Sequence, residues 1–73
     1  MKTAIIAITR NGAYLGARLR ERLADAELHV LRKHGGSAGK GALLFDGELK
    51  EVVARLWPQV SGFVFIMAAG IVV

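Results

Sequence analysis

The sequence predicts an α/β fold, a three-stranded parallel sheet (order 2-1-3) with helices on both faces. Two observations predict it. The apolar runs at residues 3–8 and 63–67 have the length of strands and no polar–apolar alternation, which is typical of parallel strands covered on both faces. Segments with helical periodicity separate the candidate strands, and this order favours right-handed crossovers. The three strands would be the truncated half of a doubly wound domain.

The first strand is expected at residues 3–8, and the turn at residues 9–12 ends it. This turn contains a hydroxyl, an amide and a glycine, which suit a tight turn that also caps a helix. Thr9 or Asn11 is therefore the expected N-cap of a helix over residues 13–24.

The helix over residues 13–24 carries leucines at intervals of four residues, which predict its apolar face. These leucines are Leu15, Leu19 and Leu23. Gly12 and Gly16 also share a face, and a glycine inside a helix costs roughly 1 kcal/mol relative to alanine. We expect close packing of this face on the sheet to offset that cost.

Residues 27–31 alternate polar and apolar side chains, as expected of a strand with one buried face or at the edge of a sheet. The second strand is therefore placed at the edge, beside the first. Residues 32–46 contain four glycines and predict a long connection without regular structure. A connection of this length is usually functional or mobile.

The clearest amphipathic pattern follows Asp46, which is the expected N-cap, with Glu48 in the first turn. Pro58 ends this helix. Its apolar stripe consists of Leu49, Val52, Val53, Leu56 and Trp57. The third strand, at residues 63–67, is expected in the centre of the complete sheet.

Composition limits the classes of function. A chain of 73 residues makes one small domain, and the absence of cysteine excludes disulfides, thiolate metal sites and cysteine nucleophiles. The formal net charge of +4 favours an anionic partner. No signal peptide or membrane span is recognised, so we expect a cytoplasmic protein without a membrane partner. Tyr14 and Trp57 are expected to be packing residues, because aromatic and basic residues do not interleave around them as in nucleic-acid binding surfaces.

A binding site is expected where the first and third strands end, because doubly wound sheets bind ligands beyond the carboxyl ends of their strands. The candidate substrate-binding residues are Thr9, Arg10, Asn11, Gly12, Met67, Ala68, Ala69 and Gly70. The start of the first helix and the Arg10 guanidinium would bind a carboxylate, and the small residues 68–70 would let a large flat ligand approach the backbone. The alternative is that the turn only caps the helix, Arg10 is a solvated charge and the small residues serve packing.

Other motifs have simpler explanations. The glycine-rich stretch at residues 34–41 does not match a phosphate-binding loop, because His34 stands where the first glycine belongs and Gly41 follows Lys40 where a hydroxyl belongs. We expect a flexible surface loop. His29 and His34 are expected to be solvated, and no metal site or catalytic residue is identified.

Three blocks of the sequence, in order, resemble the N-terminal domain of the cobalamin biosynthesis protein CbiG, the cobalt-precorrin 5A hydrolase. The blocks are residues 7–12, residues 45–50 leading to Leu56-Trp57, and residues 65–73. The resemblance implies a hydrolase that opens a δ-lactone on a cobalt-bearing tetrapyrrole and releases acetaldehyde. It implies no resident cofactor, because the substrate carries the cobalt.

The family continues beyond Val73, so residues 1–73 are expected to be an incomplete N-terminal domain that is inactive alone and supplies part of the macrocycle site. Two other functions stay open: a small basic module that binds nucleotides or nucleic acid, and a non-catalytic interaction fragment. The apolar residues 63–73 would in the last case dock on a partner chain, on the missing remainder of the domain or on a second copy.

Overall fold

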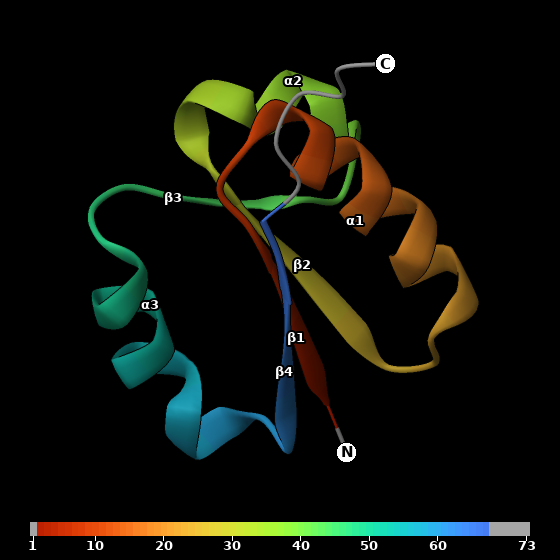
Figure 1. The fold of residues 1–73 in the computed structure, drawn as a ribbon. Helices are drawn as coiled ribbons and strands as arrows, with labels where there is room; N and C mark the ends of the chain where they lie inside the picture. Colours follow the sequence, from red (N-terminus) through yellow and green to blue (C-terminus); the bar gives the residue numbers. More distant parts are fainter. Residues whose placement is uncertain (1, 68–73) are drawn as a thin grey trace.

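The computed structural model describes residues 2–67 and shows an all-parallel sheet with helices on both faces (Figure 1). Short 3₁₀ turns at Arg32–His34 and Trp57–Gln59 complete the described elements. In chain order the strands and helices are β1 (Thr3–Ala7), α1 (Arg10–Arg22), β2 (Ala26–Leu31), α2 (Gly35–Ala38), β3 (Leu43–Phe45), α3 (Leu49–Leu56) and β4 (Gly62–Ile66).

The sheet has four strands in the order β3-β2-β1-β4. Strand β1 pairs in parallel with β2 on one side and with β4 on the other, with Thr3 opposite Ala26 and Gly62. The predicted parallel α/β fold and the position of the first strand between the other two are therefore confirmed. The predicted number of three strands is wrong, because β3 adds a fourth strand beside β2.

One predicted strand position differs from the structure. Strand β2 is interior, and the polar residue His29 within it is buried, so the alternation of polar and apolar residues did not indicate a solvated edge. Strand β4 lies at the outer end of the described sheet, beside β1, as the order 2-1-3 predicted, and the Phe65 side chain is 47% exposed. The central position expected of this strand concerned a sheet with further strands beyond the described residues.

Residues 32–46 contain more regular structure than their glycines predicted. The 3₁₀ turn Arg32–His34 leads into α2, and Leu43–Phe45 forms β3. Ala38 and Phe45 bury their side chains on opposite faces of the sheet, and these contacts hold the segment in place. The connection is therefore folded because two of its apolar residues belong to the core.

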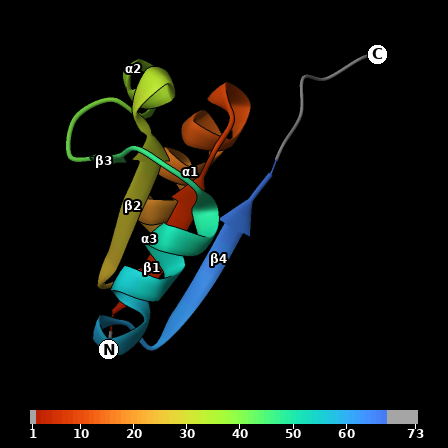
Figure 2. The same cartoon turned by 90° about the vertical axis from the view of Figure 1, so that its left-hand side faces the viewer.

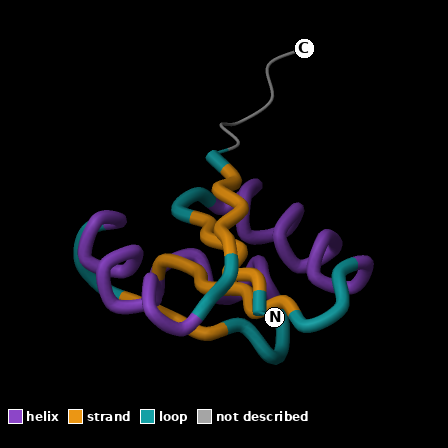
Figure 3. Tube along the Cα trace, turned by 90° about the horizontal axis from the view of Figure 1, so that it is seen from below, coloured by secondary structure: helices purple, strands orange, loops and turns teal. Residues whose placement is uncertain are grey.

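Each face of the sheet has its own apolar core. On the face covered by α1 and α2 the core includes Ile5, Leu28 and Val30. On the other face, Ile6 and Phe45 pack against α3. Figures 2 and 3 show α1 and α3 on opposite sides of the strands. Alternate residues of β1 thus enter different cores. This explains why polar and apolar residues do not alternate along the strand.

Helix α1 packs on the sheet through small residues. Its buried positions are Gly12, Ala13 and Gly16, whereas Leu15 and Leu23 are exposed. The predicted leucine face is therefore wrong for these two leucines, while the close packing expected of the two glycines is confirmed. A Cβ on Gly16 would lie 2.7 Å from Leu28 Cδ1, so only glycine fits at this distance without a shift.

Helix α3 buries Val52 and Leu56, as its apolar stripe predicted. Asp46 is not its N-cap. Glu48 holds that position, and Asp46 instead accepts a hydrogen bond from Arg32 Nε at 2.9 Å. Among residues 2–67, no helix has the length and apolar character needed to cross a membrane.

Candidate functional site

The candidate site begins at the turn between β1 and α1. Thr9 is the N-cap of α1, and its side-chain oxygen accepts a hydrogen bond from the backbone N–H of Gly12 at 2.9 Å. Between the two caps that the sequence allowed, the structure therefore selects Thr9. Arg10, the first residue of the helix, is exposed, and the first turn of α1 contains no acidic residue.

The turn lies directly against the carboxyl end of β4. A Cβ on Gly12 would be 2.8 Å from the backbone oxygen of Ile66, so the helix start and the strand end are in contact. Met67 follows Ile66, and its side chain is 54% exposed. Thr9, Arg10, Asn11 and Gly12 are thus brought beside Met67, while the predicted site residues Ala68, Ala69 and Gly70 lie outside the described residues.

This arrangement favours an anion. Backbone N–H groups at a helix N-terminus and the positive end of the helix dipole attract negative charge, and Arg10 adds a full positive charge. The two described segments of the site, residues 9–12 and 66–67, contain no carboxylate and no imidazole. Their chemistry therefore suits binding of a carboxylate more than activation of water.

A buried polar cluster lies on the α3 face of the sheet, and the sequence did not predict it. His29 is only 5% exposed, and its Nε2 lies 3.3 Å from Glu27 Oε1. Lys2 Nζ donates a hydrogen bond to Glu27 Oε2 at 3.2 Å. The expectation of a solvated His29 is wrong because Glu27, two residues earlier on the same face of β2, provides a polar partner.

The cluster predicts acid sensitivity. Burial alone would raise the pKa of Glu27, but the hydrogen bonds and charges of Lys2 and His29 outweigh it, and the pKa falls below the ordinary 4.5. A carboxyl with a lowered pKa in the folded state stabilises the fold above its unfolded pKa, and this contribution is lost as the pH falls through the folded value. We expect Glu27→Gln to reduce the loss of stability between neutral pH and pH values below 4.5.

Urea unfolding followed by circular dichroism on both sides of that pH measures the effect. Glu21→Gln, at an exposed position of α1, is the matched control. This variant should lose as much stability between the two pH values as the original chain does. If both variants behave alike, Glu27 does not carry the acid sensitivity.

The glycine-rich segment is attached to α1. Arg20 Nη2 donates a hydrogen bond to the backbone oxygen of Lys40 at 3.0 Å. Gly39 and Gly41 have positive φ values of 72° and 86°, a conformation that glycine adopts readily. His34, at the end of the 3₁₀ turn, is half-buried. The segment is therefore hydrogen-bonded to α1 and includes the short helix α2, where its composition predicted a loop.

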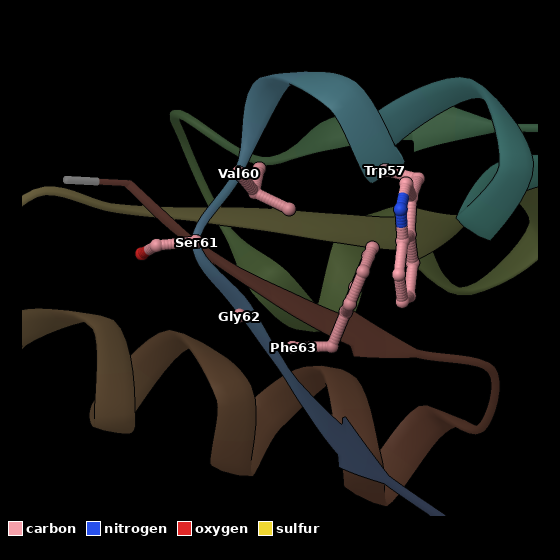
Figure 4. A pocket seen from close by; sticks show the side chains of 5 residues that line it. All are labelled: Trp57, Val60, Ser61, Gly62 and Phe63. Carbon is pink, nitrogen blue, oxygen red and sulfur yellow. The ribbon is translucent and has the colours of Figure 1, made fainter.

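A half-open groove of about 390 Å³ lies between the 3₁₀ turn after α3 and the start of β4. Its lining residues are Trp57, Val60, Ser61, Gly62 and Phe63. Figure 4 shows the Trp57 and Phe63 rings face to face, with centroids 6.1 Å apart, and the Phe65 ring continues the row 5.6 Å from Phe63. Trp57 is 70% exposed, so the expectation that it is a packing residue is wrong.

Tyr14 is exposed as well, which contradicts the same expectation for this residue. Arg18 lies over its ring, with the guanidinium carbon 5.9 Å from the centroid, and donates a weak hydrogen bond to its hydroxyl at 3.5 Å. The pair forms a polar surface on α1.

Within residues 2–67, no three histidine or acidic side chains gather as a metal site would require. The described features of interest are thus the edge formed by the start of α1 and the end of β4, the Glu27 cluster and the aromatic groove. Comparison of the chain with protein-family models, with curated proteins and with solved structures finds no match.

Proposed function

We propose that this chain is the incomplete N-terminal domain of a cytoplasmic CbiG-like protein, a hydrolase that opens the δ-lactone of cobalt-precorrin 5A and releases acetaldehyde. In this proposal the described strands are half of a doubly wound sheet, and the chain supplies part of the macrocycle-binding site. The sequence support is the three ordered blocks, which together extend from residue 7 to residue 73.

The structural observation that supports the proposal is the contact between Gly12 and the backbone oxygen of Ile66. This contact places the N-terminus of α1 and Arg10 beside the end of β4. In α/β folds, ligands bind at this carboxyl end of the strands. A corrin precursor has several carboxylates around a flat ring. Backbone N–H groups and a guanidinium are suitable donors for one of these carboxylates.

The proposed role of this chain is binding, and the proton transfer is assigned elsewhere. Hydrolysis of a lactone needs a base that activates water and donors that stabilise the oxyanion. Residues 9–12 and 66–67 offer donors and no base. We therefore assign the general base to parts of the enzyme other than these two segments, and the chain alone is expected to be inactive.

The binding role can be tested by titrating the protein with cobyrinic acid, a cobalt corrin with free carboxylates, and recording the corrin absorption spectrum. Arg10→Gln should weaken binding by about 10- to 150-fold, because a charge-assisted hydrogen bond contributes about 1.5–3 kcal/mol. Arg22→Gln is the matched control. It removes the same charge from the opposite end of the same helix and should bind as tightly as the original chain.

Equal loss of affinity in both variants would mean that net charge, and not the edge formed by α1 and β4, holds the ring. An absence of binding in the original chain would contradict the proposed site altogether.

A specific observation favours a second candidate, the interaction fragment. The exposed edge of β4 and the aromatic groove beside it form an apolar surface. This surface includes the row of Trp57, Phe63 and Phe65. No comparable observation favours a nucleotide-binding module, because the glycine-rich segment is held against α1 by Arg20.

A further inference from the structure

The outer side of α1 carries a row of two arginines with a tyrosine between them. Arg10, Tyr14 and Arg18 are spaced four residues apart and therefore lie one above the other on the same side of the helix. All three are exposed, whereas the buried positions of α1 lie on the side that faces the sheet. The sequence read in a line hides this row, because three residues separate each member from the next.

The positive charge of Arg18 is displaced toward the start of the helix. Its guanidinium carbon lies 5.9 Å from the centre of the Tyr14 ring, and its Nη1 donates a weak hydrogen bond to the Tyr14 hydroxyl at 3.5 Å. Helical side chains lean toward the N-terminus of their helix. This contact therefore brings the Arg18 charge nearer to Arg10 than its backbone, which lies about 12 Å away along the helix axis.

The row has hydrogen-bonding capacity that the described chain does not use. Among residues 2–67, neither Arg10 nor Arg18 forms an ion pair, although Glu21 is only three residues beyond Arg18. The Tyr14 hydroxyl accepts its hydrogen bond from Arg18, so its own hydrogen is free to be donated to a ligand. Two guanidinium groups and a hydroxyl donor suit a ligand with more than one carboxylate.

Tyr14 also provides an aromatic surface between the two charges. The residue is 56% exposed. A flat ring with acidic side chains at its rim can lie against Tyr14 and place one carboxylate on Arg10 and another on Arg18. In a layered α/β domain the outer side of a helix faces solvent whether or not the sheet continues beyond β4, so this surface stays open in a larger domain.

We infer that the outer side of α1 is a second contact surface for the macrocycle. Arg10 and Arg18 bind different carboxylates of one ring, and Tyr14 packs against the ring between them. The inference rests on the proposed function, because it takes the same class of substrate, a flat ring with several carboxylates. It extends the site from the end of β4 onto the outer side of α1.

The charged part of this surface is tested by titration with two corrins, cobyrinic acid and cobinamide, in which amides replace the carboxylates. Arg18→Gln should weaken binding of cobyrinic acid by about three- to fivefold, since an exposed ion pair contributes less than a buried one. It should leave binding of cobinamide unchanged. Arg22→Gln is the matched control, because it removes an exposed charge one turn farther from Arg10, and it should bind both corrins as the original chain does.

The aromatic part is tested with the same two ligands. Tyr14→Ser removes the ring and should weaken binding of both corrins, because the contact with the ring does not depend on charge. Leu15→Ser is the matched control at the neighbouring exposed position of α1, and it should bind both corrins as the original chain does. Urea unfolding of each variant checks that it is folded.

The outcomes distinguish this inference from the proposed function. Unchanged binding of cobyrinic acid by Arg18→Gln, together with the loss expected of Arg10→Gln, would overturn the inference and leave the proposed function in place. Equal losses in Arg18→Gln and Arg22→Gln would overturn it as well, because they would indicate the overall charge of α1. Retention on single-stranded DNA that Arg18→Gln reduces, with corrin binding unchanged, would assign the row to nucleic acid. An original chain that binds neither corrin would contradict the proposed function itself and the inference with it.

Discussion

Replacing Ile5 with alanine is expected to lower the free energy of unfolding by about 2–5 kcal/mol, the range for large-to-small substitutions in a core. Ile5 is fully buried in β1 and lies opposite Leu28 on one neighbouring strand and Val64 on the other. A domain of this size has a total stability of roughly 4–11 kcal/mol, so the loss is a large share of it.

Urea unfolding followed by far-ultraviolet circular dichroism, at one protein concentration, measures the change. Leu15→Ala is the control, because the exposed Leu15 side chain should contribute no more than about 0.5 kcal/mol. This pair also distinguishes the structure from the leucine pattern of the sequence, which predicted Leu15 on the apolar face. Comparable losses in both variants would contradict the position of α1 on the sheet.

Replacing Gly12 with alanine is the second change with a large expected effect. The added Cβ would lie 2.8 Å from the backbone oxygen of Ile66 and 2.8 Å from the Thr9 hydroxyl that caps α1. Backbone cannot move aside as a flexible side chain does, so α1 must shift or lose its cap. We expect a net loss of about 1–3 kcal/mol despite the better helix propensity of alanine.

The matched control is Gly36→Ala. Gly36 lies in α2 with open space where a Cβ would be, so alanine there should be neutral or stabilising by about 0.5–1 kcal/mol. If Gly12→Ala proves as stable as the original chain, the start of α1 does not lie as close to β4 as the structure shows, and the candidate site loses its geometry.

Much of the fold could be predicted because the signals were local. The unbroken apolar run of β1 indicated a strand buried on both faces, and Gly12 and Gly16, one turn apart, indicated a close approach of helix and sheet. The neighbouring positions of the turn at residues 9–12 and the end of β4 followed from parallel topology, which brings strand ends to one edge. Val52 and Leu56 were recognised from helical periodicity.

The remainder depended on contacts between distant residues. Strand β3 has three residues, two of them exposed leucines, and it forms because Phe45 enters the core beneath α3. The burial of His29 depends on Glu27 and Lys2. The spacing of Glu27 and His29 on one face of a strand was a usable signal. The alternation of polar and apolar residues, by itself, indicated that this face is exposed to solvent. Nothing in residues 34–41 indicated that Arg20 would bind the Lys40 backbone.

The pairing of β1 with β4 has a consequence for how the chain acquires its fold during synthesis. Ser61, at the entry to β4, donates hydrogen bonds to the backbone oxygen of Lys2, 59 positions earlier in the sequence. Strand β1 therefore keeps the edge that pairs with β4 free until residues 62–66 have left the ribosome exit tunnel. Such distant pairings slow folding, because the entropy of closing the intervening chain is lost before the contact forms.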